Sequence, residues 1–170
     1  ALFLHYEVCP TVLQARLPLG LLVDTWGGRA FVGVVALSEL GISPVIPFLP
    51  SIDGILQKVG LSHEAVNVRT YVKPRAGGPA GIYFFTLDCS SSLPMVGARA
   101  LFNLPYRLAS MTRERVESPS EILRFASKRK VNSLLGSERP AELEVKWTPG
   151  EDTLEGDALG TFFVERYCLY

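Results

Sequence analysis

The chain has 170 residues, of which 48% are hydrophobic and 20% charged, and its 17 basic side chains balance 17 acidic ones. This composition fits one globular domain that buries enough surface to fold without a metal ion or a disulfide framework. The balanced charge excludes a broad basic surface for nucleic acid, and no apolar run is long enough to span a membrane.

The three cysteines, Cys9, Cys89 and Cys168, lie far apart in the sequence. An odd number at this spacing suits neither a disulfide framework nor a metal site, and the chain has only two histidines. Glycine motifs of the kind that bind phosphate are also absent. We therefore expect reduced thiols in a cytoplasmic protein that needs no metal and no cofactor.

The first predicted elements are a strand over residues 2–8 and a short helix over residues 10–17. Residues 20–40 predict a hairpin, because the Gly27-Gly28 pair supplies the positive backbone angles of a tight turn. The second strand of this hairpin is apolar on both faces, which is typical of a strand covered on both sides.

The rest of the chain predicts short strands with two or three helical segments between them. A proline- and glycine-rich stretch at 74–81 predicts the turn of a second hairpin. The expected elements are an apolar loop at 41–54, one or two helical turns at 55–61, strands at 63–72 and 82–88, a helix from Ser90 to Phe102, strands at 106–116, 121–130 and 141–148, and a short helix within 156–167 before a last strand.

About eight strands with short helices and frequent turns predict a mainly β protein of the α+β class, built on an antiparallel sheet or a closed barrel. We expect a single domain over residues 1–170. Both ends of the sequence fall inside predicted strands, so we expect a chain that is truncated at both ends.

The candidate site begins with Asn67, Arg69 and Tyr71, which alternate along one predicted strand and therefore share a face. An arginine is always charged and offers a two-pronged fork to an anion such as a carboxylate. Tyr106 and Arg107 follow a predicted helix and a proline, at a junction where a scaffold can fix reachable side chains. The alternative is a polar strand face in solvent, with the Tyr106 hydroxyl hydrogen-bonded and Arg107 solvated.

Other catalytic constellations are not indicated. The sequence has no GxSxG motif, and neither His5 nor His63 stands beside a nucleophile, so we expect both histidines to be structural or exposed. Glu64 and Glu165 are expected to be surface or salt-bridged acids, and the basic run 128–130 a solvated strand end.

Five segments together resemble the YqjF-like bacterial family of uncharacterised proteins, within the acetoacetate decarboxylase-like superfamily. They are Leu2–Val35, NVRTYV (Asn67–Val72), FFTLD (Phe84–Asp88), ARALFNLPY (Ala98–Tyr106) and ERYCLY (Glu165–Tyr170). The resemblance implies a cone-shaped antiparallel β-barrel with a ligand cavity and two or three short helices. It also implies that the barrel is incomplete at the C-terminus, because relatives continue with more strands. Ala65 departs from the family, whose members often carry an acid there.

The resemblance also implies a comparison with the decarboxylases of that superfamily. Their active site contains a helix that runs into Pro-Lys-Lys, and the first of these lysines forms a Schiff base. The matching run here is Pro105-Tyr106-Arg107. Tyrosine cannot form an imine, and arginine stays protonated. None of the five lysines falls at this junction, so we expect imine-type decarboxylation to be absent.

We therefore expect a small-molecule-binding barrel whose ligand is an anionic or carbonyl-bearing organic molecule. Two alternatives remain open: a different enzyme that uses Tyr106 as general acid, and a structural or assembly protein that uses residues 43–50 as a contact surface. A homo-oligomer is possible, whereas neither nucleic acid nor a membrane is an expected partner. The expected ligand-binding residues are Asn67, Arg69, Tyr71, Tyr106 and Arg107.

Overall fold

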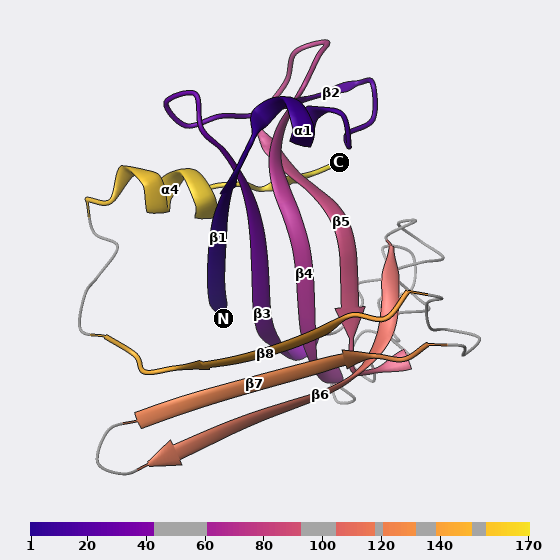
Figure 1. The fold of residues 1–170 in the computed structure, drawn as a ribbon, viewed down its shortest axis with the longest axis vertical. Coiled ribbons are helices and arrows are strands. Elements are labelled where there is room, and N and C mark those ends of the chain that lie inside the picture. Colours follow the sequence, from indigo (N-terminus) through magenta and orange to yellow (C-terminus); the bar gives the residue numbers. More distant parts are fainter. Residues whose placement is uncertain (43–60, 93–104, 118–120, 132–138, 151–155) are drawn as a thin grey trace, which may run out of the picture.

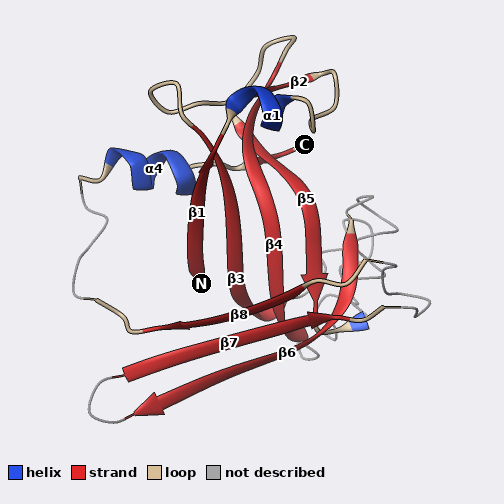
Figure 2. Cartoon of the chain, viewed as in Figure 1, coloured by secondary structure: helices blue, strands red, loops and turns tan. Residues whose placement is uncertain are grey.

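The computed structural model describes residues 1–42, 61–92, 105–117, 121–131, 139–150 and 156–170. Strands dominate these ranges, and two helices lie near one end of the molecule (Figure 2). The strands are β1 (Leu2–Val8), β2 (Leu21–Val23), β3 (Ala30–Ile42), β4 (Leu61–Pro74), β5 (Gly81–Cys89), β6 (Tyr106–Glu117), β7 (Glu121–Arg129), β8 (Glu142–Trp147) and β9 (Cys168–Leu169). The helices are α1 (Pro10–Gln14) and α4 (Ala158–Val164).

All nine strands belong to one sheet in the order β1-β3-β4-β5-β6-β7-β8, with β2 added to β4 and β9 added to β5. The strands β1, β3, β4 and β5 run side by side, and β6, β7 and β8 cross one end of them (Figure 1). The sheet therefore curls into a half-barrel. This confirms the predicted mainly β fold with short helices.

Two details of the predicted topology are wrong. β2 does not form a hairpin with β3, because Leu21–Val23 pair with the end of β4 instead. The Gly27-Gly28 turn does form, with φ angles of 56° and 81°, and closes a bridge between Trp26 and Arg29. The sheet is also not purely antiparallel, since β5 pairs in parallel with both β6 and β9. Residues 41–42 of the predicted loop at 41–54 belong to β3, and the rest of that loop lies outside the described residues. Nearly all of the predicted helices at 55–61 and 90–102 also lie outside them.

The alternation of side chains along β4 gives the sheet two different faces. On one face, Phe31, Tyr71 and Ile82 form a hydrophobic cluster with Phe162 and Phe163 of α4. We call this the arginine face, because Asn67, Arg69 and Tyr71 of β4 all belong to it.

The opposite face is the apolar core of the half-barrel. Ala36 and Val66 pack there against Phe125 of β7, which is completely buried. Leu143, Val145 and Trp147 of β8 join this cluster, as their alternation in the sequence predicts. The crossing strands thus cover one face of β4, and α4 packs on the other.

Candidate functional site

Arg69 is buried on the arginine face, with 9% of its surface exposed. Its guanidinium carbon lies 5.2 Å from the ring centroid of Phe3 and 5.9 Å from that of Tyr71. Among the described residues no carboxylate forms an ion pair with Arg69, and its Nε has no hydrogen-bond partner. A buried charge is costly unless it is paired, so this side chain provides a positive charge without a counter-ion.

The hydroxyl group of Tyr71 lies beside Arg69 and is joined to His5 Nε2 by a hydrogen bond of 2.6 Å. Tyr71 is fully buried, and the His5 ring stacks on Phe163 with 3.6 Å between centroids. Burial raises the pKa of Tyr71, against the effect of Arg69 and Arg166. Burial and the charge of Arg69 lower the pKa of His5 to about 4. Both groups are therefore neutral at pH 7, and neither supplies a counter-charge to Arg69.

Gly33 of β3 leaves the space in which these groups meet. It pairs with His5 of β1 on one side and with Arg69 of β4 on the other. A Cβ atom at position 33 would lie 3.3 Å from the Tyr71 hydroxyl oxygen and 3.4 Å from both Arg69 Cγ and His5 Cδ2. Even the smallest side chain would therefore crowd this site.

Asn67 and Tyr106 lie on the same face, further along the sheet. Asn67 pairs with Leu87 of β5, and Leu87 pairs with Tyr106 of β6, so their side chains point the same way. Asn67 is 7% exposed, and its Oδ1 has no hydrogen-bond partner in the part of the chain that the structure describes. Burial, with smaller effects of Glu39 and Cys89, raises the pKa of Tyr106 to about 12. The Tyr106 hydroxyl is thus a hydrogen-bond donor and a weak acid.

Arg107 lies on the opposite face. It is paired in register with Asp88, and its Nη1 donates to the backbone oxygen of Tyr106 at 3.1 Å. Asp88 in turn is bound by Arg129, at 2.9 Å. Because neighbouring residues of a strand point to opposite faces, Tyr106 and Arg107 cannot line one cavity. The structure brings four of the five predicted residues to one face and separates Arg107 from them.

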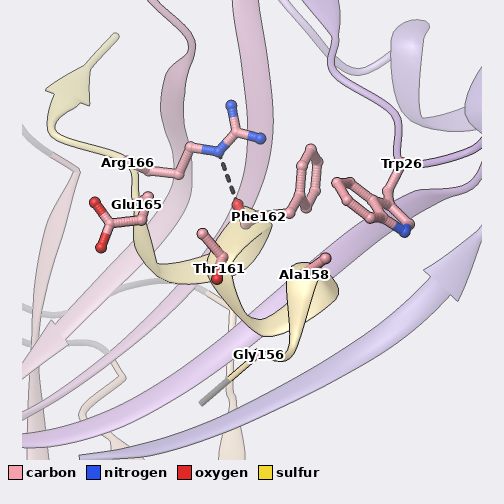
Figure 3. A pocket seen from close by; sticks show the side chains of 7 residues that line it. All are labelled: Trp26, Gly156, Ala158, Thr161, Phe162, Glu165 and Arg166. Carbon is pink, nitrogen blue, oxygen red and sulfur yellow. Dashed lines mark hydrogen bonds between the residues drawn. The ribbon is translucent and has the colours of Figure 1, made fainter. Parts of the chain in front are cut away.

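A shallow pocket of about 450 Å³ lies elsewhere, between α4 and the turn that contains Trp26 (Figure 3). Arg166 lines this pocket, but its guanidinium group already has partners within the protein. Nη1 donates to Asp24 Oδ2 at 2.7 Å, Nε donates to the Phe162 backbone oxygen at 2.8 Å, and the guanidinium covers the Phe162 ring. Arg166 therefore attaches α4 to the sheet. None of the five predicted residues lines this pocket.

Two contacts near the site cannot be predicted from the sequence. His5, which we expect to be structural or exposed, contacts Tyr71, which is 66 positions away. Arg166 reaches Asp24 across 142 positions. No local pattern signals such contacts, because they depend on which strands become neighbours. The sequence gives one indication that His5 is packed against other residues, which is the apolar character of its predicted strand.

The described ranges contain no cluster of three or more His, Cys, Asp or Glu side chains placed to hold a metal ion. In the same part of the chain, no helix has the length and apolar character needed to cross a membrane.

Residues 1–170 match the model of the DUF2071 family, an uncharacterised conserved protein. The chain belongs to the DUF2071 family. It is 32% identical over 171 residues to the uncharacterised protein YqjF of Bacillus subtilis (strain 168), a match that covers 99% of this chain and 63% of YqjF. The predicted relationship to YqjF is therefore confirmed, and the chain spans less than two thirds of this curated relative.

Solved structures show the fold that this DUF2071 chain shares with other proteins. The enduracididine biosynthesis enzyme MppR in complex with pyruvate is similar with a TM-score of 0.56 and 13% identity, over 86% of this chain and 53% of MppR. An acetoacetate decarboxylase-like enzyme from Sphingomonas wittichii RW1 is similar with a TM-score of 0.50 and 16% identity, over 75% of this chain and 49% of that enzyme. The predicted acetoacetate decarboxylase-like fold is thus confirmed.

Proposed function

We propose that this DUF2071 protein binds a small organic molecule that carries a carboxylate, and that Arg69 holds the carboxylate on the arginine face. The supporting observation is the buried guanidinium of Arg69, which has an unpartnered Nε and no ion pair among the described residues. A planar guanidinium binds a carboxylate through two parallel hydrogen bonds. An anionic ligand would therefore supply a counter-charge that no described residue gives to Arg69.

The neighbours of Arg69 suit such a ligand. The neutral Tyr71–His5 pair adds no negative charge that would repel a carboxylate. Asn67 lies two positions away on the same strand face, and its unpartnered Oδ1 can accept a hydrogen bond from a donor group of the ligand other than the carboxylate. The rings of Phe3 and Tyr71 bound the guanidinium and limit its access to water. A charge-assisted hydrogen bond is stronger in such an environment than at an open surface.

The ligand class is also supported by MppR, which shares the fold and has been solved with pyruvate. Pyruvate combines a carboxylate with a carbonyl group, the two features expected from the sequence. It is therefore the first probe for this site.

We propose that binding occurs without an imine. The lysines of the described ranges (Lys73, Lys128, Lys130 and Lys146) are all exposed. Lys73 forms an ion pair with Asp24, and Lys128 forms one with Glu142. Lys58 lies outside these ranges. The high pKa of Tyr106, about 12, favours a binding role for its hydroxyl over proton donation to a substrate. Binding is thus preferred to catalysis by Tyr106.

The test is calorimetric titration of pyruvate and acetoacetate into the protein. We expect Arg69→Gln to weaken binding by about tenfold or more, because a hydrogen bond to a charged group contributes about 1.5–3 kcal/mol. Borohydride added to the same samples should leave the mass of the protein unchanged, since no imine forms.

The matched control is Arg124→Gln, which removes an exposed arginine from β7. It should bind as the wild type does. Equal affinity of the wild type and Arg69→Gln would contradict the assigned carboxylate site, and a borohydride-trapped lysine adduct would contradict imine-free binding.

A further inference from the structure

A second polar group lies on the arginine face, at the far end of β4. Glu39 of β3 and His63 of β4 are directly paired, and His63 Nε2 approaches Glu39 Oε2 to 2.9 Å, though not in hydrogen-bond alignment. The His63 side chain is only 2% exposed, and its Nδ1 has no hydrogen-bond partner within the described ranges. A buried imidazole that lies beside a carboxylate, with neither nitrogen hydrogen-bonded within the described part of the chain, requires an explanation.

The carboxylate can select which nitrogen carries the proton. A small rotation of the His63 ring that aligned Nε2 with Glu39 Oε2 would favour the tautomer with the proton on Nε2, which leaves a lone pair on Nδ1. Imidazole is the side chain best suited to exchange a proton near neutral pH. Glu39 would also stabilise the imidazolium that forms when Nδ1 accepts a proton. His63 therefore has the arrangement of a general base that a carboxylate orients.

A hydrogen-bond donor, the Tyr106 hydroxyl, lies on the same sheet face as this pair. The charge of Glu39 contributes to the raised pKa of Tyr106, after the larger effect of burial. The Tyr106 hydroxyl therefore stays protonated and can donate to an oxyanion. Cys89 is no competing nucleophile, because burial raises its pKa and its Sγ donates to the Ser91 backbone oxygen at 3.2 Å.

The strip between the two polar groups is mainly apolar. Val35, Ala65 and Leu87 belong to it and are each at most 4% exposed, with Asn67 as its one polar member in β4. His63 and Arg69 are six positions apart, which corresponds to about 20 Å between their Cα atoms at about 3.3 Å per residue. Pyruvate is too short to reach both ends. A longer molecule with an apolar middle matches the length and the apolar character of the strip.

We propose that His63 is the general base for a long-chain oxo acid, whose carboxylate binds Arg69 and whose ketone lies beside His63 and Tyr106. This inference rests on the proposed carboxylate site. A C–H bond next to the ketone breaks, its proton moves to His63 Nδ1, and its electron pair moves to the carbonyl oxygen to form an enolate. The Tyr106 hydroxyl donates a hydrogen bond to the enolate oxygen. Return of the proton restores the ketone, and Glu39 is a positioning residue that acts through His63.

The experiment uses 9-oxodecanoate as the probe in deuterated water, with the intact chain. Proton NMR follows the loss of signal from the carbons next to the ketone, and calorimetry measures binding in parallel. We expect the protein to accelerate exchange. His63→Gln should lower the exchange rate by about a hundredfold or more while binding persists, as is usual for loss of a general base.

Two further variants separate the roles. Glu39→Gln should lower the maximal exchange rate by about tenfold without changing affinity, which also covers the case in which His63→Gln fails to fold. Glu142→Gln, an exposed acid in an ion pair with Lys128, is the matched control and should exchange as the wild type does. Arg69→Gln should weaken binding and leave the rate at saturation unchanged.

The results distinguish the two proposals. Binding of 9-oxodecanoate without exchange, or exchange that survives in both His63→Gln and Glu39→Gln, would overturn the assignment of His63. If neither 9-oxodecanoate nor decanoate, which lacks the ketone, binds the protein, the proposed carboxylate site itself fails. In that case nitrogen NMR of His63 shows separately which ring nitrogen carries the proton. A proton on Nδ1 would contradict the role of His63 as general base.

Discussion

At the scale of single residues, the largely buried arginines of the described ranges differ in their partners. Arg129 contacts Asp88 at 2.9 Å, and Arg166 contacts Asp24 at 2.7 Å. Arg69 is buried to a similar degree but contacts aromatic rings instead. The protein thus satisfies buried guanidinium groups where they hold the fold together. We infer that it leaves Arg69 free for a ligand.

His5 makes the stability of the protein depend on pH in a defined direction. Its pKa is about 4 in the folded protein against 6.5 in the unfolded chain, so the unfolded chain binds the proton first. The folded protein is therefore stabilised by neutral His5 in full above pH 6.5, and this contribution to the free energy of unfolding is lost as the pH falls from 6.5 towards 4. Urea unfolding at several pH values should therefore show a smaller loss of stability below pH 6.5 in His5→Gln than in the wild type.

The comparison is best made between pH 7 and 5, where few carboxylates titrate. Tyr71→Phe is the companion variant, because it removes the hydroxyl partner of His5 but keeps the ring among Phe162 and Phe163. Parallel pH profiles of the wild type and His5→Gln would show that His5 is protonated equally in both states.

The sequence predicts part of this residue-level picture. The alternation of Asn67, Arg69 and Tyr71 places them on one strand face, which the structure shows. The same rule, applied to Tyr106 and Arg107, separates these two residues. His5 and His63 could not be assigned in this way. Their partners, Tyr71 and Glu39, lie on neighbouring strands, so the contacts follow from sheet order and register.

At the scale of elements, β3 and β4 together form the site. β4 carries the polar residues of the arginine face, and β3 contributes Gly33 where a side chain would interfere. α4 covers the Tyr71 end, because Asp157 caps its first turn, Phe162 and Phe163 reach the sheet, and Arg166 is bound by Asp24. Short elements thus close the site at this end.

Gly33→Ala tests the role of this gap. The new methyl group would lie 3.3 Å from the Tyr71 hydroxyl oxygen and 3.4 Å from Arg69 Cγ, so these side chains must shift. We expect a loss of stability of about 1 kcal/mol, as is typical of slight overpacking, together with several-fold weaker pyruvate binding. Gly20→Ala is the control, because nothing lies within 4 Å of its new Cβ and its φ is not positive.

A Gly33→Ala protein that binds pyruvate as the wild type does would show that the site has no need of the gap. The measurements are calorimetric titration and urea unfolding of both variants under the same conditions.

Most elements could be predicted from the sequence, but several of their pairings could not. The spacing of apolar residues in β8 and the Gly27-Gly28 turn gave correct local structure. β2, by contrast, does not pair with β3, the next strand in the sequence, but with β4. The parallel pairing of β5 with β6 and β9 also cannot be predicted from the local sequence, since it depends on how the intervening segments cross the sheet.

At the scale of the whole molecule, the two faces of the half-barrel sheet differ in the residues that they carry. One face carries the apolar core, where β7 and β8 pack on Val66 and Ala36. The other carries the buried polar row of His63, Asn67, Arg69 and Tyr71. The fold is shared with MppR and an acetoacetate decarboxylase-like enzyme at only 13% and 16% identity. A shared fold does not imply shared chemistry, so the residues on the arginine face carry the functional proposal.

The most direct measurement is a crystal structure of the protein grown with pyruvate. We predict that the pyruvate carboxylate lies within hydrogen-bond distance of the Arg69 guanidinium, beside Asn67 and the Tyr71–His5 pair. Pyruvate bound only in the shallow pocket beside Trp26 and Arg166, with Arg69 still lacking an anionic partner, would contradict the assignment of the site.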